Sequence, residues 1–549
     1  MMQKKTTGVF ASLLLVYLVG FGIDVMDIDA SQYAAISREM MLSGSYLQVF
    51  ELGKDYLDKP PFLFWVSAFS MKIFGINNFA YKLPSLLFSL LAIFATYKFC
   101  LLYYKKEIAL MAAVILASCQ AFFLINHDVR TDTILMSWVI FSIWQLACWF
   151  KTYKIIYFFL GCAGIAGGML TKGPIALLVP IFAFGSHFIL MRNFKMFFKW
   201  QYILGVVVIA VLLLPMCYGL YQQFDLNPQK TVNGKTGVSG LRFFFWTQSF
   251  GRITGESSWN NNKNIFFLFQ NLFWGFLPWI FVFISAIYSE LKSLILKKGK
   301  ILNSEEWICM GGFIISYLAL GTSNYQLPHY IYVVLPFASI ITAKFLCRLL
   351  FQYEYPRLLR FFEKSHFVLF VLLWILLLIL LLYCFITPLW ISIAATALFI
   401  FFIAMFYRRK YNMYFLKMCL FSFISINLFL NLTVYPSLLH YQAGNNIGRW
   451  INKSNLPKER IFIYQNHIWH SIHFYSNAFI THKDSLNLVQ PGDYIVTSRD
   501  KLEDFTGSNF IFDIIYETDT YKVSQLKLKF INPATRKKSV KPFVVIKIK

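Results

Sequence analysis

The sequence predicts an all-α polytopic membrane protein of about thirteen transmembrane helices, followed by a small C-terminal α/β domain outside the membrane. Three observations predict this. Of its 549 residues, 58% are hydrophobic and only 14% are charged, whereas soluble domains carry about 25% charged residues. Apolar runs near the ~20 residues needed to cross a bilayer recur along most of the chain. From about residue 436 the pattern changes to short strand-like segments.

The apolar runs define the expected spans. They lie at about 9–25, 80–103, 107–125, 133–150, 155–171, 174–191, 202–222, 265–289, 306–321, 331–350, 366–386, 389–407 and 413–435. Lys4 and Lys5 precede the first run, as in a signal sequence, but no small-residue cleavage site follows. We therefore expect an uncleaved first helix.

Basic residues predict the orientation. With thirteen spans, seven clusters fall on one side of the membrane, and the positive-inside rule makes that side cytoplasmic. The clusters are Lys4/Lys5, Lys105/Lys106, Lys151/Lys154, Arg192/Lys195/Lys199, Lys292/Lys297/Lys298/Lys300, Arg348 to Lys364, and Arg408/Arg409/Lys410. The N-terminus is then cytoplasmic, and the tail lies on the opposite, periplasmic face of a bacterial inner membrane.

The chain divides into a transmembrane domain, 1–435, and a small domain, 436–549. The first loop, 26–79, holds two expected interfacial helices, at 31–41 with Ser31 as a possible cap and at 61–74. In the tail we expect strands at 460–464, 493–497, 510–516 and 543–548, and a helix at 470–475. A Gly-rich stretch at 233–240 has the composition of a mobile loop and does not match a P-loop.

Composition excludes several functions. The net charge of +25 comes from small clusters between apolar runs, so no nucleic acid is expected as a partner; the lipid bilayer is. The nine cysteines lie in or beside apolar runs and include no CxxC pair, so neither a disulfide framework nor a zinc ribbon is indicated.

Charged residues in the first loop form the strongest candidate site. Charge beside a membrane is costly unless water, a partner or a substrate satisfies it. Asp29 is the candidate catalytic carboxylate, able to take a proton from an acceptor, and Asp27 could share that role. Lys59 precedes two prolines that fix its backbone, and a fixed ammonium suits a lipid phosphate. The alternatives are capping acids and a lysine that extends to the membrane interface.

Other charged residues fall on the same predicted face. Asp128, Arg130 and Asp132 share a short turn, which is either a salt-bridged turn or a group that orients a substrate. Additional positive charge at Lys172, Arg242 and Arg252 could line a phosphate pocket, since Arg offers forked donors and Lys a point charge. His467, His470 and His473 recur every third residue, which we interpret as a solvated or packed helix rather than a metal site.

Several ordered motifs resemble those of the aminoarabinose (lipid A) transferases and the protein O-mannosyltransferase-like glycosyltransferases. They are Asp29-Ala-Ser-Gln-Tyr33, Tyr56-Leu-Asp-Lys-Pro-Pro61, Leu170-Thr-Lys-Gly-Pro174, Phe250-Gly-Arg252, Leu277-Pro-Trp279 and Leu327-Pro-His-Tyr330. They occur in the family's order across the first two-thirds of the chain.

The resemblance implies a GT-C fold with a periplasmic active site. It implies inverting transfer of a sugar from a polyprenyl-phosphate donor, typically undecaprenyl phosphate in bacteria, to a lipid A-like glycolipid or other envelope acceptor. On the family's pattern, Asp29 is catalytic, Asp132 is the second-loop acid, and the substrate contacts include Tyr33, Tyr56, Lys59 and Tyr330. Asp58 is the only plausible ligand for a divalent metal, which makes a metal cofactor an open expectation.

Two departures from the family concern the donor and acceptor. Ala30 stands where the family usually has Glu, and Gln326 stands where a Lys is common. A different class of function, a transporter or flippase of a lipid-linked sugar, remains the main alternative. It predicts internal repeats and charges at mid-membrane, whereas here the polar groups gather at one surface. A membrane scaffold whose tail binds envelope proteins is a third possibility.

Overall fold

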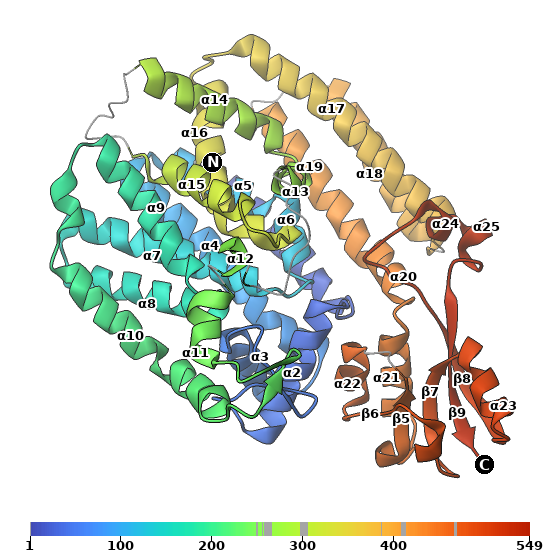
Figure 1. The fold of residues 1–549 in the computed structure, drawn as a ribbon. Helices are drawn as coiled ribbons and strands as arrows, with labels where there is room; N and C mark the ends of the chain where they lie inside the picture. The colour runs from blue at the N-terminus through green and yellow to red at the C-terminus, as the bar shows by residue number, and fades with distance from the viewer. Residues whose placement is uncertain are drawn as a thin grey trace.

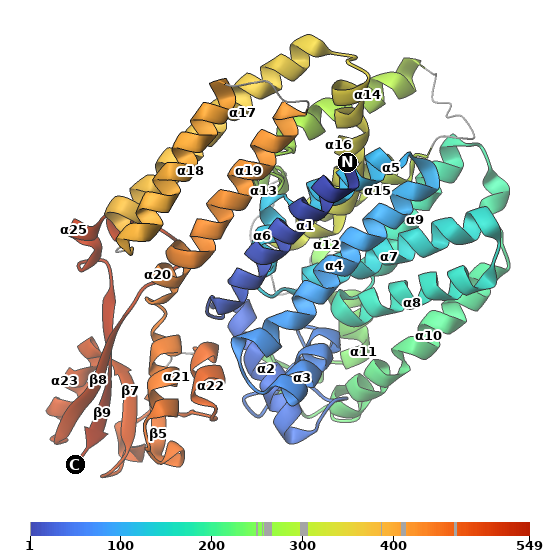
Figure 2. The ribbon, with the colours of Figure 1, turned by 180° about the vertical axis from the view of Figure 1, so that it is seen from behind.

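The computed structural model describes residues 2–248, 251–254, 256, 266–296, 306–385, 387–407, 413–465 and 469–549. It shows a bundle of helices with a smaller, sheet-containing region beside one end (Figures 1 and 2). The bundle helices are α1 Met2–Val19, α4 Asn78–Tyr103, α5 Lys106–Ala117, α6 Gln120–Ile125, α7 Thr131–Thr152, α8 Ile155–Lys172, α9 Ile175–Leu190, α10 Gln201–Leu220, α13 Phe267–Gly275, α14 Ile280–Leu296, α15 Ile308–Gly321, α16 Leu335–Phe351, α17 Pro356–Ile379, α18 Leu389–Tyr407 and α19 Tyr414–Phe429.

The multi-pass helical architecture is confirmed. Among the described residues, eight helices are long and apolar enough to cross a membrane, or nine if the bent pair α13 and α14 forms one span. Shorter apolar helices at Thr7–Gly22, Ile175–Leu190 and Ile308–Gly321 match three further predicted spans. All thirteen predicted segments are helical, and their number as true crossings stays a prediction.

One predicted span, at 107–125, is two helices. α5 ends at Ala117, and α6 begins at Gln120 after a break. The backbone N–H of Gln120 donates to the carbonyl of Leu277, 2.9 Å away, instead of to a preceding turn of its own helix. This contact with a distant loop interrupts the helix that the apolar run predicts.

Small residues allow the helices to pack closely. α8 presents glycines to α7, and a Cβ atom at Gly167 would lie only 2.6 Å from the indole of Trp138. Small residues at such positions let two backbones approach within a membrane. The antiparallel pair α7 and α8 thus brings its two polar termini, near Asp132 and Lys172, to one end of the bundle.

The first loop is folded over that end. It holds α2 Asp29–Ser43, the hairpin strands β1 Phe50–Glu51 and β2 Lys54–Asp55, and α3 Phe62–Phe74. Both predicted loop helices are confirmed. The expected cap at Ser31 is wrong: α2 begins two residues earlier, at Asp29, so Ser31 lies inside the helix.

The long loop after α10 is also ordered where it is described. A π-helical turn, Tyr221–Asp225, extends α10; the hairpin β3 Thr231–Val232 and β4 Lys235–Thr236 then falls on the Gly-rich stretch expected to be a mobile loop. The short helices α11 Gly240–Arg242 and α12 Gly251–Thr254 follow.

The C-terminal region contains a five-stranded sheet in the order β6-β5-β7-β9-β8. Its strands are β5 Ile461–Tyr464, β6 Thr481–Lys483, β7 Tyr494–Ser498, β8 Phe512–Thr520 and β9 Lys541–Ile548. β5 pairs in parallel with β6 and β7, and β9 runs antiparallel to β7 and β8. The helices of this region are α20 Tyr435–Leu439, α21 Ala443–Lys453, α22 His470–Ser476, α23 Leu502–Gly507, α24 Leu528–Ile531 and α25 Pro533–Arg536. The four predicted strands and the helix at 470–475 are confirmed, and β6 was not predicted.

Candidate active site

The first loop places Asp29 at the first residue of α2, where the helix N-terminus favours a carboxylate. Its side chain is 35% exposed and forms an ion pair with the guanidinium of Arg130. Arg130 precedes α7, a hundred residues along the chain. This contact joins the first loop to the second predicted acidic turn.

Arg130 is shared between two carboxylates. Its Nε atom also donates to Asp128 Oδ2 at 3.0 Å, and both side chains are largely buried. Burial lowers the pKa of Arg130, but the Asp128 and Asp29 carboxylates outweigh that effect and raise it overall. The salt-bridged turn considered from the sequence is therefore present. Its Arg130 also forms an ion pair with Asp29 of the first loop.

A second ion pair lies on the helix ends beside this one. Lys172, in the last turn of α8, pairs with Asp132 in the first turn of α7. The imidazole of His329 approaches the other oxygen of Asp132, with Nε2 3.6 Å away. Lys172 Nζ also lies 3.9 Å from the ring centroid of Tyr330.

His329 was missed as a site residue. Its only signal in the sequence is its position inside the motif Leu327-Pro-His-Tyr330, in which Tyr330 is the predicted substrate contact. The short 3-10 helix Pro328–Val334 brings both side chains toward Asp132 and Lys172.

Two buried tyrosines connect the parts of the site. The rings of Tyr33 and Tyr56 each lie 5.8 Å from the ring of Phe64, which holds them in edge contacts. Burial is the main cause that raises the pKa of Tyr33, and Asp29, Asp58 and Asp132 raise it further. Arg130 opposes this shift by lowering the pKa. The buried hydroxyl of Tyr56 has no hydrogen-bond partner among the described residues.

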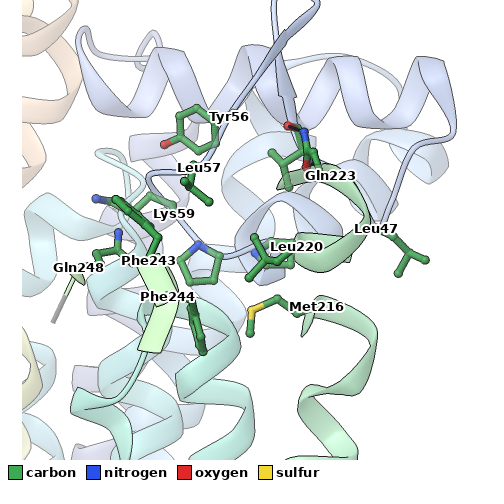
Figure 3. Close-up of a pocket in the computed structure, with 13 residues that line it drawn as sticks. Leu47, Tyr56, Leu57, Lys59, Met216, Leu220, Gln223, Phe243, Phe244 and Gln248 are labelled. Atoms are coloured by element: carbon green, nitrogen blue, oxygen red, sulfur yellow. Dashed lines mark hydrogen bonds between the residues drawn. The ribbon is translucent and has the colours of Figure 1, made fainter. Parts of the chain in front are cut away.

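Tyr56 and Lys59 line a narrow pocket between the first loop and α10, with an enclosed volume of about 20 Å³ (Figure 3). Figure 3 shows Lys59 and Gln248 on one side and Leu47 on the other. Lys59 Nζ lies 2.8 Å from Asp58 Oδ2. Most of the remaining lining is apolar: Leu47, Val49, Leu57, Pro60, Pro61, Met216, Leu220, Phe243 and Phe244. A cation at the rim of an apolar pocket suits an amphiphilic anion. Asp29 does not line this pocket.

The C-terminal region holds the segment that leads to Asp29. The N–H of Asp27 donates to Gln442 Oε1 at 3.0 Å, and its carboxylate accepts a hydrogen bond from Ser31 at 2.6 Å. Burial raises the pKa of Asp27, although the Ser31 hydrogen bond opposes this. Asp27, predicted to bind substrate, is thus engaged in contacts that shape the loop.

Further contacts fasten the same segment. Asp24 forms an ion pair with Arg449 of α21. The hydroxyl of Tyr475 accepts a hydrogen bond from the N–H of Val25 at 2.8 Å and donates one to Asn78 Oδ1 at 2.8 Å. No sequence pattern indicated this docking, because its partners lie more than four hundred residues apart.

The remaining predicted residues lie apart from these contacts or outside the description. Arg242 is exposed and faces Glu256, 3.7 Å away. Arg252 belongs to α12, and its side chain lies outside the described residues. Asp58 pairs with Lys59, and the described residues hold no group of three His, Cys, Asp or Glu side chains that could bind a metal. His470 and His473 are packed in α22, and His467 lies outside the described residues.

The two sequence departures also have structural explanations. Ala30 is fully buried, and its carbonyl accepts a hydrogen bond from Tyr81 at 2.6 Å. Gln326 is buried, and its amide donates to Gly321 O at 2.8 Å. Both positions face protein atoms.

The fold and the clustered carboxylates and cations define a multi-pass membrane protein with a candidate active site at one end of its helical bundle. The family model for dolichyl-phosphate-mannose-protein mannosyltransferases matches residues 58–218. The chain is 25% identical over 324 residues to undecaprenyl phosphate-alpha-4-amino-4-deoxy-L-arabinose arabinosyl transferase 2 of Proteus mirabilis, covering 58% of this chain and 54% of that protein. It is 25% identical over 351 residues to the transferase of the same activity from Wigglesworthia glossinidia brevipalpis, covering 62% and 58%. The matches thus span little more than half the length of these relatives.

Solved structures agree on the fold. ArnT from Cupriavidus metallidurans, in a crystal structure bound to undecaprenyl phosphate, superposes with a TM-score of 0.75 at 17% identity, covering 99% of this chain and 98% of that one. The oligosaccharyltransferase of Archaeoglobus fulgidus gives a TM-score of 0.50 at 12% identity, covering 90% and 70%. The resemblance to the aminoarabinose transferase and protein mannosyltransferase-like family is confirmed, and so is the GT-C fold.

Proposed function

We propose that this chain is an inverting glycosyltransferase that moves a sugar from a polyprenyl-phosphate donor to an envelope acceptor. In a bacterium the donor carrier would be undecaprenyl phosphate, the carrier named for the similar transferases and bound in the ArnT crystal structure. We place the reaction at the periplasmic face of the inner membrane and take a lipid A-like glycolipid as the acceptor.

One observation carries the proposal. The first loop and the start of α7, about a hundred residues apart in sequence, bring together Asp29, Asp58 and Asp132, each paired with a cation, and all three carboxylates raise the pKa of the buried Tyr33. Such a gathering of ion pairs at one end of an apolar bundle is costly to form. Clustered titratable groups of opposite charge favour a reaction site.

The chemistry follows from these positions. The acceptor hydroxyl attacks the anomeric carbon, and its proton passes to a carboxylate oxygen of Asp29. The bond between that carbon and the phosphate oxygen breaks, and the electron pair stays on the polyprenyl phosphate. Lys59 stabilises this leaving phosphate, and the unpartnered hydroxyl of Tyr56 is available to donate to the same group. Attack opposite the leaving group inverts the anomeric centre.

Arg130 would keep the Asp29 carboxylate oriented between turnovers through their ion pair. The pair Asp132–Lys172, with His329 beside it, would bind the sugar or the phosphate as a second wall of the site. The apolar lining of the pocket would receive the first isoprene units of the donor.

A transfer assay tests the proposal. Proteoliposomes receive polyprenyl-phosphate-linked sugar and envelope glycolipid, and transfer is followed by mass spectrometry. Asp29→Asn and Lys59→Ala should each lower transfer by about 100-fold or more, while exposed Arg499→Ala should leave it unchanged. Full transfer by both site variants, or movement of the lipid across the vesicle without covalent transfer, would refute it.

The acceptor and the membrane face need separate tests. Mass spectra of envelope glycolipids from a strain lacking this chain should miss one sugar mass, and that mass identifies both donor sugar and acceptor. Reporter fusions after residue 549 should report the periplasm, and a cytoplasmic signal would contradict the orientation.

A further inference from the structure

A second pocket lies on one flank of the bundle and extends along α9 toward the end opposite the candidate site. It is formed by α7, α8, α9 and α10, which lie together at one flank of the bundle in both views (Figures 1 and 2). It holds about 1010 Å³ of space that opens to the surroundings, and its lining is almost wholly apolar, with Phe150, Phe158, Ile181 and Phe184 among the residues.

The groove has the depth of one membrane leaflet. Along α9 it extends from Leu177 to Phe188, which at 1.5 Å per residue is about 16 Å. Half of the ~30 Å hydrocarbon core is about the same length. At its floor α10 packs closely on α8, because a Cβ atom at Gly205 would lie 2.9 Å from the ring of Phe158 and 3.2 Å from Cys162 Sγ.

Basic residues surround the outer end of the groove. Lys199 Nζ lies 4.7 Å from the ring centroid of Tyr153 and 5.6 Å from that of Trp149, so the α9–α10 connection lies against the end of α7. Lys151 lies in the last turn of α7, and Lys154, Arg192 and Lys195 follow α7 and α9 at the same end of these helices. Lys151 Nζ lies 4.0 Å from the ring centroid of Tyr103. The ion pairs found among the described residues include none of these five cations, and the sequence has no Asp or Glu between Asp132 and Asp225.

The rim also has the composition of a membrane interface. In the connection, Phe194, Phe198 and Trp200 are exposed by 57%, 87% and 67%. Aromatic side chains gather at the headgroup level, and basic pockets between helices bind anionic lipid headgroups. Phe197, from the short 3-10 helix Phe194–Phe197, closes one side of the groove.

We propose that this groove binds one anionic diacyl phospholipid, with an acyl chain between α8, α9 and α10 and its phosphate at Lys195 and Lys199. The site faces the leaflet opposite the candidate active site, since α7 separates Asp132 from Lys151 by nineteen residues, or about 28 Å. It goes beyond the proposed transfer reaction and does not depend on it.

Native mass spectrometry tests the site with phosphatidylglycerol and phosphatidylcholine as probes. The protein is taken from nanodiscs that contain both lipids, and the lipids retained after mild delipidation are counted. Wild type should retain phosphatidylglycerol in preference. The double change Lys195→Gln/Lys199→Gln should lower that preference about fivefold for each lysine removed.

A second variant tests the groove separately from the charge. Ile181 lines the groove and is 52% exposed, so Ile181→Trp fills the space without displacing a packed core residue, and bound lipid should be lost. Val211→Trp, on the lipid-facing side of α10 outside the groove, and Lys292→Gln, on α14, are the matched controls and should retain it.

Three results would overturn the proposal. They are equal retention of phosphatidylcholine, unchanged retention in Ile181→Trp, and displacement of phosphatidylglycerol by added polyprenyl phosphate, which would assign the groove to the carrier. Circular dichroism of each variant separates loss of binding from loss of fold.

Discussion

Replacing Arg130 with methionine should destabilise the protein more than any exposed arginine change. Arg130 contacts two carboxylates, Asp29 and Asp128, and methionine keeps an unbranched apolar side chain while removing both contacts. Asp128 is 13% exposed, and its Oδ1 atom already lacks a partner among the described residues. The variant would leave this carboxylate buried without a counter-charge.

The magnitude follows from the exposure of each partner. Breaking a buried ion pair typically costs about 3–5 kcal/mol, because the remaining charge is uncompensated. That range applies to Asp128. Asp29 is 35% exposed, so solvent screens its charge once Arg130 is removed. The lost Arg130–Asp29 pair therefore contributes about 1 kcal/mol or less to the destabilisation. We therefore expect a loss of about 4 kcal/mol in the free energy of unfolding.

The assay is thermal or denaturant unfolding of the full chain in detergent or nanodiscs, with transfer activity measured in parallel. Arg499→Met is the matched control, since Arg499 makes an exposed pair with Glu517 in the C-terminal region. Its loss should be below about 1 kcal/mol. Adding Asp128→Asn to Arg130→Met should recover at least half of the lost stability, because it removes the orphaned charge.

The reasoning would be refuted if Arg130→Met unfolded like wild type, or if Asp128→Asn brought no recovery in the double variant. Transfer should fall by about 10- to 100-fold in Arg130→Met, since Asp29 loses its orienting partner. If the Arg130→Met protein folded stably and transferred sugar at the normal rate, that result would contradict the catalytic role of Asp29.

Three further predictions concern the surroundings of the site. Gly219→Ala should cost about 1–3 kcal/mol and disturb the pocket, because its Cβ would lie 2.1 Å from the backbone oxygen of Leu47; unfolding midpoints measure this. Tyr475→Phe should raise hydrogen exchange at 23–28, because the N–H of Val25 loses its acceptor, at a cost of about 1–3 kcal/mol. Burial lowers the pKa of His473 from 6.5 to about 3. Below about pH 6.5, His473 therefore takes up a proton more readily in the unfolded state than in the folded state. The free energy of unfolding of the C-terminal region should fall as the pH drops toward 3, by up to ~1.4 kcal/mol per pH unit. His473→Gln should flatten that dependence in hydrogen exchange of α22.

Each of these has its own control. Gly321→Ala meets nothing within 4 Å of its Cβ, so a loss equal to that of Gly219→Ala would contradict the steric argument. Tyr494→Phe, on β7, should leave exchange at 23–28 as in wild type. Burial also lowers the pKa of His470, to about 4. Some pH dependence should therefore persist in His473→Gln, and an unchanged slope would show that His473 does not contribute.

The membrane architecture could be predicted, and several candidate site residues could be proposed, because their signals are local. An apolar run of twenty residues must be helical in lipid, where every backbone polar group needs an internal partner. Asp29, Lys59 and Asp132 were recognisable because charge near a membrane and a proline pair are visible along a single segment. Predictions failed where a distant contact decided the outcome: Gln120 bonds to Leu277 and splits a predicted span, and α2 begins at Asp29 rather than beyond Ser31.

The chain alone determined that this protein is a helical membrane protein, that its charges gather at the helix ends, and that strands follow the last span. Only the tertiary structure decided that Arg130 pairs with Asp29, that His329 approaches Asp132, and that Tyr475 holds the backbone before Asp29. The physical reason is that hydrophobic burial depends on composition within a short window. A hydrogen bond or an ion pair forms only where packing brings two particular atoms within a few ångströms.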